Sequence, residues 1–178
     1  LKTDVMDLYL LHWRGGTPLA ETLRAFKALQ ESGKIRHWGV SNFDVSNMEE
    51  LTRLGGGEAC AANQVQYALD TRGPEYDLLP WLQERSMPLM AYCPLGGGGL
   101  VNDPKLAPFA AKHGVSKAAI AIAFLLSKPG VQAIPKTAKP ERVHDLAKAR
   151  DVRLDADDLA ALDKAFPPPR RKQPLAMT

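Results

Sequence analysis

Short apolar runs bounded by turn residues recur along the chain and alternate with helical patterns. The runs are nearly continuous in apolar residues, and they cover residues 5–13, 35–41, 62–67, 88–95 and 131–135. Runs of this kind are typical of strands that are covered on both faces. Their spacing, roughly 25 to 45 residues for each strand-plus-helix unit, predicts parallel βα repeats and an α/β fold.

The segments between these runs predict helices with one apolar face. In the first segment, Thr17 and Pro18 supply an N-cap and a first-turn proline, and Gly33 ends the pattern. Further helices are expected over residues 44–54, 75–85 and 116–127, after Pro140, and from an Asp155 cap to residue 166. The proline-rich tail, residues 167–178, cannot continue the last helix, so we expect it to run over the surface.

The number of strands is small for a barrel. Parallel βα repeats form either a doubly wound sheet or a barrel, and the pattern alone does not choose between them. A TIM (β/α)8 barrel takes about 250 residues, whereas this chain has 178 residues and five strand-like runs. Five parallel strands in an open row would expose two edges and the inner face. If the fold is a barrel, we expect residues 1–178 to be a single partial domain that lacks the beginning of the barrel.

Composition and charge exclude several classes of protein. The chain is 45% hydrophobic and 24% charged, which predicts an ordinary globular protein with one core. The formal net charge of +3 comes from basic residues spread along the chain, so nothing demands nucleic acid. We find neither a leader pattern nor an apolar run of about 18 residues, and therefore expect a cytoplasmic protein without membrane contact. Cys60, Cys93 and the histidines lack metal-ligand spacing, so no metal site is expected.

Polar residues stand at the ends of the expected strands, where parallel βα folds carry their functional groups. These residues are His12, Ser41 with Asn42, Asn63 with Gln64, Tyr92, and Lys136 with Thr137. Taken singly, each has a structural reading, such as a histidine satisfied by backbone or a tyrosine in the core. Five polar strand ends together favour a functional site.

The side chains at the strand ends suit recognition of particular chemical groups. The hydroxyl and amide groups of Ser41, Asn42, Asn63 and Gln64 both donate and accept hydrogen bonds, which suits a neutral carboxamide, with structural hydrogen bonding as the alternative. Tyr92 can offer a face for a planar ring. Lys136 and Thr137, with Arg142 on the following helix, predict a phosphate cage near a helix N-terminus, and a solvated basic surface is the alternative.

Five motifs occur in the order in which aldo-keto reductases carry them. They are DLYLLHW at 7–13, GKIRHWGVSNF at 33–43, NQVQY at 63–67, AYCPLG at 91–96 and IPKT at 134–137. Because the motifs stand in register over nearly the whole chain, the sequence resembles that family strongly. Residues 72–81, RGPEYDLLPW, further resemble bacterial members that reduce small 2-oxoaldehydes such as methylglyoxal.

The resemblance implies a TIM (β/α)8 barrel that binds NADPH without a Rossmann domain and reduces aldehydes and ketones. This chain would hold strands four to eight, the C-terminal helix and the tail. By resemblance, His12 is the catalytic-site histidine that orients the substrate carbonyl, and Trp13 lines the substrate pocket, with plain packing as the alternative for Trp13. By the same resemblance, Ser41, Asn42 and Gln64 contact the carboxamide of the nicotinamide, and Tyr92 stacks on the nicotinamide ring. Leu95, in the same motif as Tyr92, is a further cofactor contact. Lys136, Thr137 and Arg142 contact the 2′-phosphate, and Asp145 contacts the adenine. The family's adenine-contacting Glu-Asn pair corresponds to Asp145-Leu146, so one adenine contact is expected to be lost.

The resemblance also places the family's proton-donating tyrosine, and the lysine and aspartate that tune it, before the strand that ends at His12. None of Tyr9, Tyr67, Tyr76 and Tyr92 occupies the corresponding motif. General acid catalysis contributes about 10²- to 10⁴-fold to a rate. We therefore expect the chain by itself to be nearly inactive.

Two functions from different classes follow. The first is the C-terminal part of an NADPH-dependent oxidoreductase that acts on a small-molecule carbonyl substrate. The alternative is a short, non-catalytic protein that binds a nucleotide or a partner. In that case self-association or a complementary N-terminal barrel segment would cover the open inner face.

Overall fold

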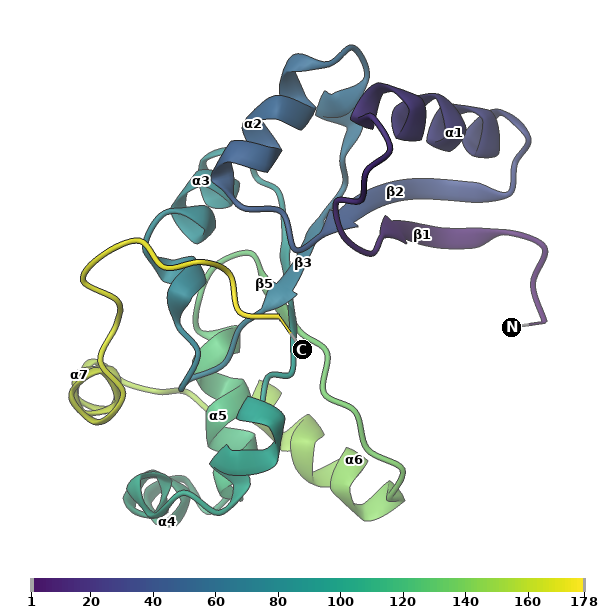
Figure 1. The fold of residues 1–178 in the computed structure, drawn as a ribbon. Helices are drawn as coiled ribbons and strands as arrows, with labels where there is room; N and C mark the ends of the chain where they lie inside the picture. Colours follow the sequence, from purple (N-terminus) through teal and green to yellow (C-terminus); the bar gives the residue numbers. More distant parts are fainter. Residues whose placement is uncertain (1, 178) are drawn as a thin grey trace.

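The computed structural model describes residues 2–177, and within them five parallel strands form one sheet in chain order (Figure 1). The strands are β1 (Met6–Leu11), β2 (Ile35–Ser41), β3 (Asn63–Gln66), β4 (Leu89–Tyr92) and β5 (Val131–Ala133). Each pairs in parallel with the next. The predicted α/β fold with parallel strands is therefore confirmed, and all five predicted strands are present.

Helices follow the strands and cover one face of the sheet. They are α1 (Leu19–Glu31), α2 (Val45–Arg53), α3 (Leu78–Glu84), α4 (Ala107–His113), α5 (Lys117–Leu126), α6 (Pro140–Ala147) and α7 (Ala156–Ala165). Short 3-10 turns lie at Gly57–Ala59, Gly73–Glu75, Gly96–Val101, Pro104–Leu106 and Lys148–Arg150. The sequence did not predict α4, which occupies part of the connection between β4 and α5.

The helix caps test the predicted boundaries. Asp155 caps α7 in a capping box with Asp158, so that prediction is confirmed. The predicted start of the first helix is wrong by one residue. Pro18 is in an extended conformation and occupies the cap position itself, and α1 begins at Leu19 without a side-chain cap from Thr17.

The position of a residue along its strand decides which face of the sheet its side chain occupies. Tyr9 of β1 and Trp38 of β2 both pack against Phe26 of α1, with ring centroids 6.1 and 5.0 Å from the Phe26 ring. Successive side chains along a strand point to opposite faces. Three positions further along the chain, His12 and Ser41 are therefore directed to the face of the sheet opposite α1.

One expectation about strand burial is wrong. In β1 the side chains of Asp7 and Tyr9 are exposed, whereas a strand covered on both faces would bury them. The reason is that α1 covers this face only in part, through the edge contact of Phe26 with Tyr9. Arg36 of β2 pairs with Asp7 at this exposed surface.

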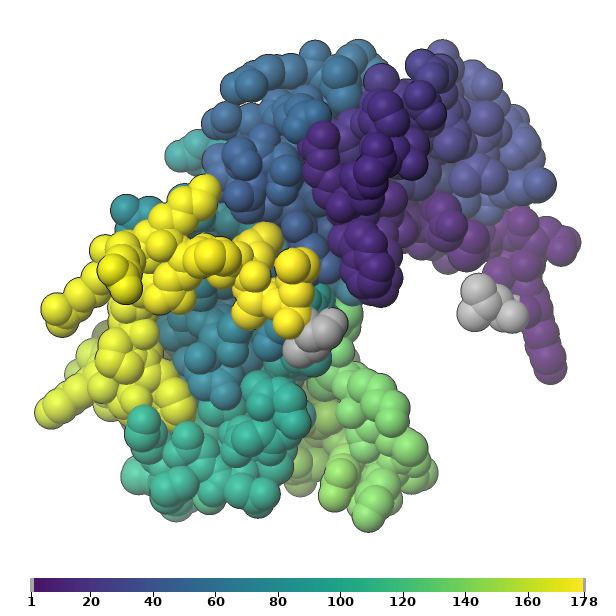
Figure 2. Space-filling view, viewed as in Figure 1, coloured from purple at the N-terminus to yellow at the C-terminus, as the bar shows by residue number. Residues whose placement is uncertain are grey.

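The core lies between the sheet and the helices. Most of the residues of α5 are buried there. No single helix in the part of the chain that the structure describes is long and apolar enough to cross a membrane. The sharply bent pair 104–113 and 117–126 meets the length and composition criteria only when its two parts are taken together. Residues 167–177 form neither helix nor strand and cross the surface (Figure 2).

Candidate functional site

A cleft of about 660 Å³ lies at the carboxyl ends of β1 to β4. Six of the residues singled out from the sequence line it together, and they are His12, Trp13, Ser41, Asn42, Gln64 and Tyr92. Arg14 and Met177 complete the lining. The residues meet because the carboxyl ends of parallel strands share one edge of the sheet.

Asn42 is the hub of the hydrogen bonds in this cleft. Its backbone is in the left-handed region, with φ at 60°, a conformation that asparagine tolerates better than most residues. Its amide nitrogen donates to the main-chain oxygen of His12, at 3.1 Å, and to Ser41 Oγ, at 3.2 Å. The hydroxyl of Tyr92 donates to Asn42 Oδ1 at 3.0 Å. One side chain thus connects the ends of β1, β2 and β4.

Ser41 and Gln64 fix the junction between β2 and β3. Ser41 is buried, and its hydroxyl donates to the main-chain oxygen of Gln64 at 2.7 Å. The backbone nitrogen of Asn42 donates to the same oxygen at 2.9 Å. Among residues 2–177, the side-chain amide of Gln64 has no hydrogen-bond partner, although it lines the cleft. It is therefore available to a ligand as both a donor and an acceptor.

Asn63, the neighbour of Gln64, has a structural role. It is fully buried, and its amide nitrogen donates to the main-chain oxygen of Phe43 at 2.8 Å. The oxygen Asn63 Oδ1 has no hydrogen-bond partner among the described residues. The bond to Phe43 holds the loop that follows β2, and Asn42 belongs to that loop.

His12 and Trp13 form one wall of the cleft. The two rings stack with centroids 4.2 Å apart and an angle of 23° between their planes. The side chain of Trp13 is largely exposed. Because the main chain of His12 is held by Asn42, the stack presents the imidazole at a fixed place beside the amides.

Arg14 is a cleft residue that the sequence analysis missed. Its guanidinium makes a bidentate pair with Glu50 of α2, in which Nη2 lies 2.9 Å from Oε1 and Nη1 contacts Oε2. Hydrogen bonding to this partner raises the pKa of Arg14 and lowers the pKa of Glu50. Arg14 lies two residues beyond His12, which places it at the same strand end, but nothing in the sequence indicates Glu50 as its partner.

The expected phosphate-binding residues lie apart from the His12 cleft, at the end of β5 and on α6. Lys136 and Arg142 are exposed and form no ion pair within residues 2–177. Thr137 Oγ1 accepts from the backbone nitrogen of Lys139 at 3.2 Å. The two cations are therefore free to contact an anion.

The two remaining predicted cofactor residues also lie outside the cleft. The carboxylate of Asp145 accepts a hydrogen bond from Ser116, the N-cap residue of α5, so it has a structural partner. Leu95 is partly buried and packs against the hydrophobic core.

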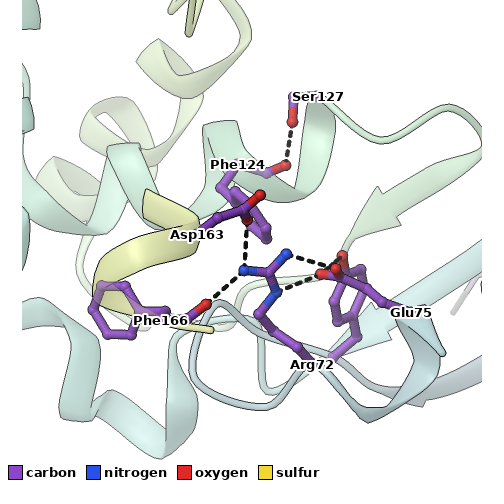
Figure 3. A network of polar contacts seen from close by, with 7 residues as sticks. Arg72, Glu75, Phe124, Ser127, Asp163 and Phe166 are labelled. Atoms are coloured by element: carbon purple, nitrogen blue, oxygen red, sulfur yellow. Dashed lines mark hydrogen bonds and ion pairs between the residues drawn. The ribbon is translucent and has the colours of Figure 1, made fainter. Parts of the chain in front are cut away.

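An ionic network around the buried guanidinium of Arg72 lies where the C-terminal tail begins (Figure 3). Arg72 donates from Nε and Nη2 to the Glu75 carboxylate, at 2.8 and 2.6 Å. Its Nη1 donates to Asp163 Oδ1 at 2.7 Å and to the main-chain oxygen of Phe166 at 2.6 Å. The hydroxyl of Tyr67 donates to Glu75 at 2.7 Å. This network ties the loop after β3 to the end of α7.

The chain matches the sequence profile described as the Aldo/keto reductase family over residues 1–166. It is 47% identical to the methylglyoxal reductase YeaE of Escherichia coli strain K12, and the match covers 99% of this chain and 64% of that protein. It is 34% identical to the glyoxal reductase of Bacillus subtilis strain 168, with 92% of this chain and 58% of that protein covered.

A solved structure of the same family is also similar to this chain. An aldo-keto reductase from Klebsiella pneumoniae, in complex with NADPH, has a TM-score of 0.96 and 48% sequence identity. The superposition covers 99% of this chain and 64% of that one. This chain therefore spans less than two thirds of the length of these relatives.

Proposed function

The chain belongs to the aldo/keto reductase family, and we propose that it carries the nicotinamide-binding cleft and the carbonyl-orienting histidine of an NADPH-dependent carbonyl reductase. The observation that carries this proposal is the convergence of Ser41, Asn42, Gln64 and Tyr92 on one cleft beside His12. These groups come from four successive strand ends and reach the cleft together.

The hydrogen-bonding capacity of the cleft fits a nicotinamide. A carboxamide has one acceptor oxygen and two N–H donors. The side-chain amide of Gln64 is unpaired within the described residues and can serve either need. Asn42 Oδ1 accepts one hydrogen bond from Tyr92 and retains a second lone pair. The aromatic ring of Tyr92, which lines the same cleft, offers a stacking face.

The cations near α6 fit the phosphate that distinguishes NADPH from NADH. Lys136 and Arg142 are exposed and have no acidic partner in the described chain. A guanidinium binds a phosphate through two parallel hydrogen bonds, and such charge-assisted bonds are about twice as strong as neutral ones. The Klebsiella pneumoniae relative was crystallised with NADPH, which supports this choice of cofactor.

His12 supplies the group that acts on the substrate. When bound, NADPH provides the hydride for the carbonyl carbon. The imidazole of His12 donates a hydrogen bond to the carbonyl oxygen and orients it, while Trp13 and Met177 form walls of the same cleft. Small 2-oxoaldehydes are the proposed substrates, because two relatives are a methylglyoxal reductase and a glyoxal reductase.

We propose that the proton donor of the reaction comes from outside the described strand ends. Tyr67 is buried and donates to Glu75, and burial raises its pKa further from neutrality. Tyr9 lies on the opposite face against Phe26. Neither lines the His12 cleft. The five strands are proposed to be the last five of an eight-stranded barrel, since they superpose closely on 64% of the Klebsiella pneumoniae chain.

Replacement of His12 tests this function in a protein that includes this chain and reduces methylglyoxal. The change His12→Ala should lower kcat by about 10²-fold, as expected for loss of one preorganised hydrogen-bond donor, and leave the Kd of NADPH within about twofold. His37→Ala is the matched control, because His37 is an exposed histidine of β2 that does not line the cleft. Turnover equal to the unsubstituted protein would contradict the assignment.

A further inference from the structure

The C-terminal strap, residues 167–177, connects the ionic network around Arg72 to the cleft. Its first residue follows Phe166, whose main-chain oxygen accepts from Arg72 at 2.6 Å. At its other end, Met177 lines the cleft, and the main-chain oxygen of Ala176 lies 3.4 Å from the hydroxyl of Tyr92. The strap therefore has a fixed base and a tip that forms part of the cleft wall.

Among the described residues, two ion pairs of Lys172 hold the middle of the strap, and Leu175 beyond it packs against the core. Residues 170–174 are all exposed and belong to no helix or strand. Within this stretch, Lys172 Nζ lies 3.1 Å from Asp77 Oδ2 and 4.0 Å from Asp44 Oδ2. Figure 2 shows the yellow strap lying on the blue and teal surface formed by the N-terminal half of the molecule.

The two acids that face Lys172 are themselves well placed. Asp44 is the N-cap residue of α2, where its carboxylate accepts from the backbone nitrogen of Asn47 at 2.9 Å and from Ser46 Oγ at 2.7 Å. Asp77 occupies the cap position of α3 but makes no side-chain cap hydrogen bond. Its carboxylate is thus available to the lysine.

The charges on this contact persist across the neutral range. The hydrogen bond to Asp77 raises the pKa of Lys172. Burial raises the pKa of Asp44, but the hydrogen bonds from Ser46 and Asn47 and the charge of Lys172 outweigh it, and the net shift is downward. Asp44 also stands two residues after Asn42. The ion pairs of Lys172 therefore join the strap to the loop that carries Asn42, whose amide donates to His12.

We propose that Lys172 is a positioning residue: its ion pairs with Asp77 and Asp44 hold the strap across the molecule and so place Met177 in the wall of the cleft. The tether acts through the strap and touches no reacting group. Because both partners are partly exposed, salt weakens it. The effect of the tether on cofactor binding rests on the proposed function, whereas the placement of Met177 does not.

Charge reversal tests the tether in a protein that includes residues 1–178. The variants are Lys172→Glu, Asp77→Lys and the double variant that exchanges both charges. Asp77 is preferred to Asp44 because its side chain makes no cap hydrogen bond, so its replacement leaves α3 capped as before. Arg171→Ala is the matched control, since Arg171 is exposed on the same strap and has no ion-pair partner in the described residues.

Two measurements report the position of the strap without any cofactor. The ¹³C-methyl NMR signal of Met177 should move toward its position in an unfolded chain in both single variants and return in the double variant. The rate of trypsin cleavage after Arg170 should rise about two- to fivefold in Lys172→Glu, the range expected for loss of an exposed ion pair. The control Arg171→Ala should leave the Met177 signal in place.

The tether would be refuted if the Met177 signal is unchanged in Lys172→Glu, or if the exchanged pair fails to restore it. About 1 M salt should reproduce the single-variant spectrum in the unsubstituted chain, because charges are screened over about 3 Å at that concentration. NADPH is then titrated into the same samples. Failure of the unsubstituted protein that includes this chain to bind NADPH would overturn the proposed function and leave the Met177 result to decide the tether.

Discussion

The side-chain nitrogen of Asn42 donates a hydrogen bond to the main-chain oxygen of His12 across 3.1 Å. Asn42 follows β2 and His12 follows β1, so this bond fixes the distance between two strand ends that play different parts in the proposed reaction. The group that orients the substrate and the group that holds the nicotinamide are thereby set relative to each other before a ligand arrives.

Replacement of Asn42 should affect both stability and cofactor binding. The change Asn42→Asp keeps the acceptor for Tyr92 but loses the donors to His12 and Ser41. Since each hydrogen bond contributes about 0.5–1.5 kcal/mol, urea unfolding should show a loss of about 2 kcal/mol. NADPH binding should weaken at least in proportion. Asn42→Gly keeps the left-handed backbone without strain, and binding as tight as in the parent would show that the side chain is not needed.

A side chain at Gly96 should cost stability, because the backbone there is left-handed and the Asp70 carboxylate would have to move. Its φ is 59°, and a Cβ there would lie 2.1 Å from Asp70 Oδ2. We expect Gly96→Ala to lower the free energy of unfolding by about 1–3 kcal/mol, as overpacking and a strained backbone each cost stability. Adding Asp70→Ala should recover part of the loss by removing the clash. The control is Gly99→Ala, where a Cβ meets nothing within 4 Å, and an equal loss there would contradict the steric explanation.

Arg72 should be the most costly charge to remove from the fold. It is buried, and its fork contacts Glu75, Asp163 and the oxygen of Phe166. Breaking a buried pair leaves an uncompensated charge, so Arg72→Met should cost about 3–5 kcal/mol in urea unfolding. Arg72→Lys should not rescue stability, because an ammonium cannot reproduce the fork.

Tyr67→Phe is the reference for the Arg72 prediction, since it removes one hydrogen bond to Glu75 and keeps the ions paired. It should cost about 1 kcal/mol. A smaller loss for Arg72→Met than for Tyr67→Phe would show that the network does not stabilise this region.

Asp158 should make stability depend on acidity. Burial raises its pKa, but hydrogen bonds from Lys112 and His113 outweigh burial, and its pKa in the folded chain lies below the ordinary value. As pH falls below about 4, the unfolded chain therefore takes up the proton first, and stability declines until the folded carboxylate is protonated too. Asp158→Asn should be less stable at pH 7 and should show a flatter acid limb in urea unfolding between pH 5 and 2. If the free energy of unfolding falls with pH equally steeply in Asp158→Asn and in the parent, Asp158 is not the source of the acid dependence.

The sequence predicted the strand ends of the cleft well. Short apolar runs locate the strands, and parallel strands bring their carboxyl ends together, so His12, Ser41, Gln64 and Tyr92 could be placed near one another without a structure. The Asp155 cap was predictable for a similar reason, because a capping box is a local pattern.

Features that depend on distant partners were not predictable. Glu50 lies 36 residues from Arg14, and Lys172 approaches Asp77 only because the strap folds back over α3. Such pairs leave no periodic pattern in the chain. The same limit applies to Met177, whose place in the cleft depends on the path of a tail that has no regular structure.

The preference for NADPH over NADH tests the central claim most directly. In a protein that includes this chain, calorimetric titration of both cofactors should give tighter binding of NADPH to the unsubstituted parent. Arg142→Ala should weaken NADPH by about tenfold or more, since a charge-assisted hydrogen bond contributes about 1.5–3 kcal/mol, and should leave NADH nearly unchanged. Lys148→Ala, an exposed lysine just beyond α6, is the control. Equal losses for both cofactors, or no saturable binding of NADPH to the parent, would contradict the account.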